Sequence, residues 1–290
     1  MSASPRNLAA SVKARLQNEA ARRGEDFNLL LLRYGIERLL FRLSRSAYAD
    51  RFLLKGAMLF VVWDVKTHRP TRDLDLLGFG SSDKVDLQRV FQEVATQPVV
   101  DDGVVFDPAS VRAEEIREDN AHGGIRVRLL AKLGPAEVPV QIDVGMGDAV
   151  TPAPEAATFP ALLDFPAPQV RIYPVYTVVA EKLEAMAKLG SANTRMKDFH
   201  DVWFLTRRFQ LDGPTLRRAI EATFARRETP LPVWPDPLSD ALARDATKQI
   251  QWAAFIRRHG LTGLPGQFAD VVVACREYLS PVLCPPPSAS

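Results

Sequence analysis

The chain has 290 residues, of which 47% are hydrophobic and 25% charged, which are typical values for a globular protein of one or two domains. A net charge of +2 excludes an overall positive field that would attract nucleic acid, so RNA contacts must come from local patches. The sequence shows no membrane-spanning run, no signal peptide and only two cysteines, Cys275 and Cys284, so we expect a soluble, cytoplasmic protein with idle thiols.

The first part of the chain, residues 7–44, is predicted to form two helices. Apolar residues recur near helical spacing before Gly24, and the segment after it carries a broad apolar face. The second segment also contains several arginines, which point either to a solvated face, the favoured interpretation, or to contacts with phosphates. These arginines are Arg33, Arg38, Arg42 and Arg45.

A turn of small residues, Lys55-Gly56-Ala57, precedes an apolar segment of ambiguous structure. Its first residues favour a helix that begins at Gly56, whereas the run from Phe60 to Trp63 favours a strand. Such a turn lets a phosphate approach backbone N–H groups. A loop at 67–71 follows, where His68 lacks a histidine partner at metal-ligand spacing.

The sequence RDLDLL then places two aspartates in a segment that reads as a buried strand. Side chains alternate along a strand, so Asp73 and Asp75 point the same way, roughly 7 Å apart. Two carboxylates on one face suit a hard cation such as Mg²⁺. The motif is weak alone, because many such pairs merely end a strand, but with the preceding turn it is typical of a nucleotidyltransferase site.

Further along, a helix is predicted at 84–96, capped by Ser82-Asp83, and strands at 104–106, 109–116 and 125–133. The strand at 139–144 puts its valines and Ile142 on one side, with Gln141 and Asp143 on the other. Asp143 is therefore either a third acid beside Asp73 and Asp75 or a surface acid near a strand end.

Six prolines crowd into residues 151–174, which we interpret as a linker or a wrapping segment. Helical patterns follow, and one ends at Gly190, a plausible cap. Lys182 on that helix reads as a solvated lysine unless other evidence places it in a site. On the next helix Asp198 and Asp201 share a face, where they either orient a lysine or favour the helix N-terminus.

Three stretches together resemble the AbiEii/AbiGii nucleotidyltransferase toxins of type IV toxin–antitoxin and abortive-infection systems, which are related to the mycobacterial MenT enzymes. The resemblance covers residues 29–208, and no single motif would be specific. The stretches are KGAMLFVVWDVKTHRPTRDLDLLGFG, VQIDVGMGDAVTP and VVAEKLEAMAKLGSANTRMKDFHDVWFL.

This resemblance implies an α/β (α+β) fold: a polymerase-β-like nucleotidyltransferase domain with a mixed sheet, followed by a mostly helical domain. We expect the first domain at 1–150, the proline-rich linker at 151–174, and the helical domain, with nucleotide or RNA contacts, at 175–290. It also implies a helix after the Lys55-Gly56-Ala57 turn.

The resemblance further implies roles for individual residues. Asp73 and Asp75 hold Mg²⁺ or Mn²⁺, and Asp143 completes the metal site or helps to deprotonate the attacking hydroxyl. Lys182 reaches the triphosphate. Asp198 joins Asp73, Asp75, Asp143 and Lys182 as an expected catalytic residue. Further nucleotide contacts match the family motifs at Lys55, Gly56, Ala57, Arg69, Thr71, Arg195, Lys197 and Asp201. Ala57 stands where the family usually has Gly or Ser, so a hydroxyl contact to phosphate is missing there.

The function implied is metal-dependent transfer of nucleotides from an NTP to RNA, with the 3′ acceptor end of tRNA as the expected acceptor, so that aminoacylation and translation fail. A cognate antitoxin is the implied partner. Alternatives are transfer to a small molecule or a protein hydroxyl, and a non-catalytic nucleotide-binding module. The presence of all three aspartates and Lys182 argues against the last.

Overall fold

The structure is a computed structural model that describes residues 7–63, 71–116, 123–231 and 236–284. Its contacts separate two compact units. The first unit takes the described residues within 1–66, 70–147 and 155–172, and the second takes those within 148–154 and 173–290. Each unit is described by itself.

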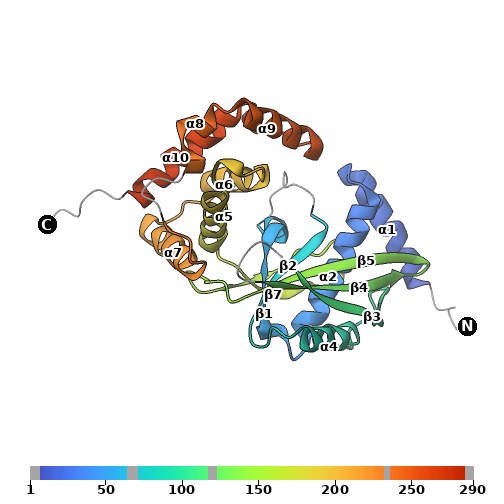
Figure 1. The fold of residues 1–290 in the computed structure, drawn as a ribbon. Coiled ribbons are helices and arrows are strands. Elements are labelled where there is room, and N and C mark those ends of the chain that lie inside the picture. Colours follow the sequence, from blue (N-terminus) through green and yellow to red (C-terminus); the bar gives the residue numbers. More distant parts are fainter. Residues whose placement is uncertain (1–6, 64–70, 117–122, 232–235, 285–290) are drawn as a thin grey trace, which may run out of the picture. The chain divides into compact units, whose positions relative to one another are not determined.

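The first unit is built on a mixed sheet of seven strands in the order β3-β4-β5-β2-β1-β7-β6 (Figure 1). The strands are β1 (Phe52–Lys55), β2 (Asp73–Gly78), β3 (Val104–Ile116), β4 (Gly124–Leu133), β5 (Ala136–Met146), β6 (Glu155–Thr158) and β7 (Gln169–Ile172). β2 runs parallel to β5 and antiparallel to β1, and β1 runs parallel to β7. The expected α/β fold with a mixed sheet is therefore confirmed.

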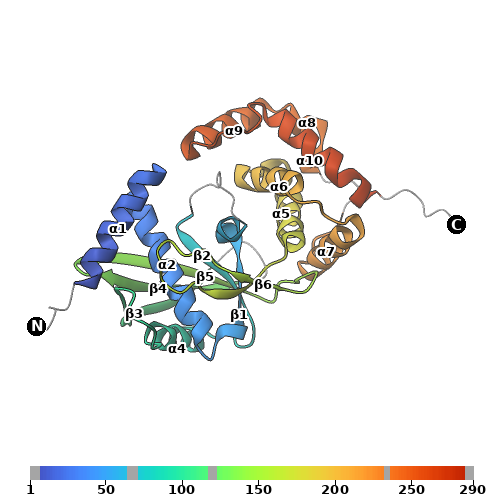
Figure 2. The same cartoon turned by 180° about the vertical axis from the view of Figure 1, so that it is seen from behind.

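Three helices accompany the sheet: α1 (Leu8–Arg23), α2 (Phe27–Arg45) and α4 (Lys84–Ala95). Alternation along the strands makes one face of the sheet apolar, as with Ile142 and Val144 on β5. α2 packs closely on that face, because a Cβ added at Gly35 would lie 3.6 Å from both Val138 and Val140. Figure 2 shows α2 against the strands. The opposite face keeps its polar residues.

The small-residue turn after β1 is helical. It forms a 3₁₀ turn, η2 (Gly56–Met58), that continues into one turn of α-helix, α3 (Leu59–Val62). Gly56 has φ +70°, a left-handed conformation that glycine adopts without strain. The helical interpretation of this segment is therefore confirmed, and the strand alternative is wrong.

Two segments differ from the elements expected from the sequence. The separate strands predicted at 104–106 and 109–116 are one strand, β3, whose pairing shifts between Asp107 and Arg112 in an irregularity that Pro108 accompanies. The proline-rich segment, interpreted as a linker or a wrapping segment, carries β6 and β7, which pair with each other and extend the sheet beyond β1.

Two arginines of α2 are buried in the first unit. Arg38 is fully buried and forms an ion pair with Glu37, and Arg42 makes two hydrogen bonds to the carboxylate of Asp102, at 2.8 and 3.1 Å. Arg42 also donates to the carbonyl of Val104. A solvated face and a phosphate-binding face are therefore both wrong for Arg38 and Arg42.

We expect Arg42→Met to lower the free energy of unfolding by about 3 to 5 kcal/mol, because it leaves the buried carboxylate of Asp102 without its cation. Urea unfolding followed by circular dichroism measures the change. Arg45→Met on the same helix, where the side chain is exposed, is the control and should stay within about 0.5 kcal/mol of the wild type. Equal losses in the two variants would contradict the assignment.

The second unit is helical in its described part. Its helices are α5 (Val175–Leu189), α6 (Met196–Arg208), α7 (Gly213–Arg226), α8 (Asp240–Ala243), α9 (Ala246–His259) and α10 (Phe268–Leu283). Short 3₁₀ turns lie at η1 (Ala49–Arg51) in the first unit, and at η3 (Gly190–Ala192) and η4 (Asp236–Leu238) in the second. Gly190 caps α5 as expected. No helix in the described ranges is long and apolar enough to cross a membrane.

A half-buried arginine, Arg227, joins the end of α7 to the rest of this unit. Arg227 contacts Asp148 at 3.1 Å, Glu181 at 3.2 Å and Glu184 at 2.8 Å. Burial also affects Cys275 on α10, where it raises the pKa of the thiol to about 12, so that this cysteine is inert at neutral pH. Both cysteines are free thiols.

Candidate active site

Four charged residues lie side by side across four neighbouring strands on the polar face of the sheet. Strand register places Lys55 of β1 opposite Asp75 of β2, Asp75 opposite Asp143 of β5, and Asp143 opposite Arg126 of β4. Residues directly opposite each other point to the same face. We call Lys55, Asp75, Asp143 and Arg126 the charged row: two acids flanked by two cations.

Asp75 lies directly against the turn that follows β1. A Cβ added at Gly56 would lie 2.0 Å from the Oδ2 atom of Asp75 and 2.6 Å from its Cγ atom, so no other residue fits there without moving the carboxylate. The glycine therefore serves two needs, the left-handed φ and the close approach of Asp75. Ala57, the next residue, is buried.

Asp73 lies two residues before Asp75 in β2, and its side chain points to the same face of the sheet. Its neighbour on β5 is Gln141, whose side-chain amide is 3.5 Å from the Asp143 carboxylate. Thr71 is 3.4 Å from the carbonyl oxygen of Asp73, at the limit of a hydrogen bond. Arg69 and His68 lie outside the described residues.

Asp143 has a close partner that the sequence motifs did not indicate. The guanidinium of Arg126 donates to both of its oxygens, from Nε at 2.8 Å and from Nη2 at 2.7 Å. This hydrogen bonding, with the charges of Asp143 and Asp73, raises the pKa of Arg126 above its ordinary value. The alternation IRVRLLAKL put Arg126 on the polar side of its strand, but nothing in the sequence fixed the register with Asp143.

The three aspartates supply the right donors for a divalent cation, namely carboxylate oxygens on one face of two adjacent strands. In the described part of the chain, however, no group of three or more acidic, histidine or cysteine side chains is already gathered around a metal position. The Asp143 carboxylate is hydrogen-bonded to Arg126. The residues therefore fit a cation through Asp73 and Asp75, and Asp143 can join them once it leaves Arg126.

A second charged group lies on α5 and α6 of the second unit. Lys182 is 2.6 Å from Oδ2 of Asp201 and 3.2 Å from Oδ1 of Asp198, and both aspartates are almost fully buried. Arg195 contacts Oδ2 of Asp198 at 2.8 Å. Asp198 and Asp201 do share a helix face, and that face holds the ammonium of Lys182. We call Lys182, Arg195, Asp198 and Asp201 the lysine cluster.

His200 extends the lysine cluster into an aromatic layer. Its Nδ1 atom is 2.7 Å from Oδ1 of Asp201, and its ring stacks on Phe204 and contacts Phe255. It is therefore a packing residue that also supports the carboxylate next to Lys182. Lys197 is half-buried at the first turn of α6.

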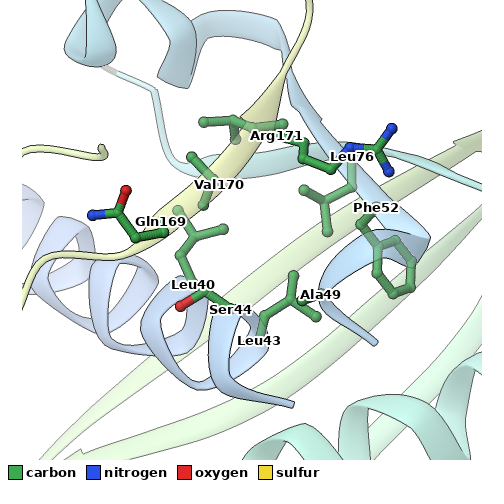
Figure 3. A pocket seen from close by; sticks show the side chains of 10 residues that line it. Leu40, Leu43, Ser44, Ala49, Phe52, Leu76, Gln169, Val170 and Arg171 are labelled. Atoms are coloured by element: carbon green, nitrogen blue, oxygen red, sulfur yellow. The ribbon is translucent and has the colours of Figure 1, made fainter. Parts of the chain in front are cut away.

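A small pocket of the first unit lies elsewhere (Figure 3). Apolar side chains of α2, β1, β2 and β7, including Leu40, Leu43 and Phe52, line it, with Gln169 and Arg171 of β7. Its volume of about 10 Å³ admits roughly one water molecule. This pocket is far too small for a nucleotide, and it contains none of the expected site residues.

A protein-family model described as nucleotidyl transferase AbiEii toxin, of type IV toxin–antitoxin systems, matches residues 38–273. The chain belongs to the AbiEii nucleotidyltransferase toxin family. The match contains both the charged row and the lysine cluster.

Two solved structures from Helicobacter pylori are similar to this AbiEii-family chain. One is JHP933, at 13% identity and a TM-score of 0.47, with 85% of this chain and 88% of that one covered. The other is described as a putative nucleotidyltransferase, at 13% identity and a TM-score of 0.46, with 85% and 90% covered. No curated protein matches.

Proposed function

We propose that this AbiEii-family protein uses a divalent cation to transfer nucleotides from an NTP to the 3′ end of tRNA in the cytoplasm. The charged row carries the proposal, because it aligns two strand carboxylates beside a turn that only glycine can form so close to Asp75. Lys55, Gly56 and Ala57 face the nucleotide phosphates in this proposal. Arg69 and Thr71 keep the nucleotide contacts that the sequence motifs imply for them.

The reaction joins a hydroxyl oxygen of the acceptor to the α-phosphorus, while the bond from that phosphorus to the bridging oxygen breaks and pyrophosphate leaves. Asp73 and Asp75 would hold Mg²⁺ or Mn²⁺, which neutralises the charge that develops on the phosphoryl oxygens. Asp143 completes this set or takes the proton from the attacking hydroxyl. Lys55, at the other end of the charged row, adds a positive charge on the same face.

The lysine cluster supplies the remaining proposed contacts. The ammonium of Lys182 is held by two buried carboxylates, and the Lys182 side chain is 16% exposed, so the lysine is oriented yet able to meet a phosphate. Asp198 and Asp201 orient it, and Arg195 and Lys197 add positive charge near the start of α6. A phosphate that meets Lys182 therefore finds a cation whose position is already fixed.

Backbone contacts to RNA would come from exposed arginines of the helical unit. Arg207, Arg208, Arg218 and Arg226 are exposed, whereas Arg227 is engaged with Asp148, Glu181 and Glu184. Phosphate contacts position RNA without reading its sequence. They are compatible with an acceptor end that many tRNAs share.

The family's place in type IV toxin–antitoxin systems leads us to propose a cognate antitoxin as partner. Two other functions predict different products. Transfer to a small molecule or a protein hydroxyl would need no exposed arginines, and a non-catalytic nucleotide-binding module would need no acids in register. The four exposed arginines favour an RNA acceptor, and the register of Asp75 with Asp143 favours an enzyme over a binding module.

The test incubates the purified chain with Mg²⁺, total tRNA and each of the four labelled NTPs. We expect label to enter tRNA with one NTP, and to be lost with EDTA and in Asp73→Ala. Label that enters protein or a small molecule instead would move the function to the second class. Nucleotide binding with no label transferred to any acceptor would contradict the enzyme.

A further inference from the structure

Arg126 is the member of the charged row to which neither the motifs nor the proposed chemistry gives a role. It lies on β4 directly opposite Asp143, and it makes both of its hydrogen bonds to that carboxylate at ordinary charge-assisted distances, 2.8 and 2.7 Å. Its side chain is 30% exposed and that of Asp143 is 21% exposed. This ion pair therefore lies at the surface of the polar face, within reach of a solute.

The surroundings of Arg126 set its pairing. Glu114 of β3 lies opposite Arg126 on its other side, but its carboxylate contacts Arg128 at 2.6 Å. Arg126 thus donates its side-chain hydrogen bonds to Asp143 and not to Glu114. The guanidinium of Arg126 therefore faces β2 and β5, the two strands whose carboxylates are proposed to bind a cation.

We propose that Arg126 is a positioning residue that holds Asp143 as an internal counter-ion, so that a divalent cation must compete with it for this carboxylate. The inference rests on the proposed cation site of Asp73 and Asp75. It explains why the three acids are in register across two strands, yet are not already gathered around a metal position in the described residues.

The competition has a physical reason. Three carboxylates on adjacent strands repel one another, and a fixed guanidinium lowers that repulsion while no metal is bound. A divalent cation supplies two charges at the same place, so it can displace the arginine from Asp143. The arginine then remains nearby as a positive charge that opposes the cation.

The sign of a mutational effect separates this role from a purely structural one. If Arg126 competes with the cation, its removal frees Asp143 and removes an opposing charge, and cation binding becomes tighter. If Arg126 only keeps Asp143 and the strands in place, its removal disorders the site, and cation binding becomes weaker. The two roles predict opposite changes in one measured constant.

The experiment titrates the full chain with Mn²⁺ in the absence of nucleotide and measures the dissociation constant by calorimetry or electron paramagnetic resonance. We expect Arg126→Gln to bind Mn²⁺ about five- to tenfold more tightly than the wild type. Arg126→Lys keeps the charge without the paired hydrogen bonds and should fall between the two. Arg128→Gln, two residues along β4 and paired with Glu114, should match the wild type.

A second background tests whether the effect passes through Asp143. In Asp143→Asn, which has no carboxylate to release, the gain from Arg126→Gln should shrink to less than about twofold. Unchanged or weaker Mn²⁺ binding in Arg126→Gln, or an equal gain in the Asp143→Asn background, would overturn the inference alone. A wild type whose Mn²⁺ binding is absent or insensitive to Asp73→Ala would overturn the proposed cation site, and this inference with it.

Discussion

Gly56→Ala is expected to lower nucleotidyl transfer by at least about a hundredfold, although it adds a single methyl group. The methyl carbon would lie 2.0 Å from Oδ2 of Asp75, far inside van der Waals contact. Either the carboxylate rotates away from the turn or η2 moves away from β2. Both changes move the carboxylate of Asp75 relative to the carboxylates of Asp73 and Asp143. A displacement of about 1 Å at a reacting centre is enough for such a loss.

The matched control is Gly24→Ala at the end of α1. Gly24 has φ +67°, close to the +70° of Gly56, but a Cβ there meets nothing within 4 Å. Both variants therefore carry similar backbone strain, roughly 1 to 2 kcal/mol in unfolding free energy. Gly24→Ala should transfer nucleotide at the wild-type rate. Transfer by Gly56→Ala above about a tenth of that rate would show that the carboxylate of Asp75 tolerates displacement.

Local sequence patterns were sufficient where a single strand or turn determines the structure. Alternation along RDLDLL placed both aspartates on one face, and Gly56 after Lys55 marked a turn of small residues. The caps of the helices were also local, as with Asp83 before α4. Each of these features depends on residues a few positions apart, so the sequence contains the whole cause.

Pairings between distant residues could not be predicted in this way. Arg126 meets Asp143, and Arg42 meets Asp102, through strand register and helix packing that no local pattern specifies. An arginine on a predicted amphipathic helix looks solvated until the sheet beside it supplies a buried acid. β6 and β7 are four residues each, and they form because β1 offers an edge for β7 to pair with.

Lys182→Met should affect both nucleotide binding and stability. The ammonium is shared by Asp198 and Asp201, which are 1% and 2% exposed, so its loss removes a cation from two buried carboxylates. We expect the free energy of unfolding to fall by about 3 kcal/mol. If the ammonium also contacts the triphosphate, NTP affinity falls about ten- to a hundredfold, the equivalent of one charge-assisted contact.

Two further variants separate these effects. Lys188→Met, at the exposed end of α5, removes a lysine from the same helix and should change neither quantity. Asp201→Asn removes one carboxylate that holds Lys182 but leaves the charge of the Lys182 ammonium in place. It should therefore lower stability, while NTP affinity falls less than in Lys182→Met. Calorimetry with each NTP below the unfolding transition provides the affinities. An unchanged affinity in Lys182→Met, with reduced stability, would make this lysine a structural counter-ion of two buried acids and would leave phosphate binding to the turn at Gly56.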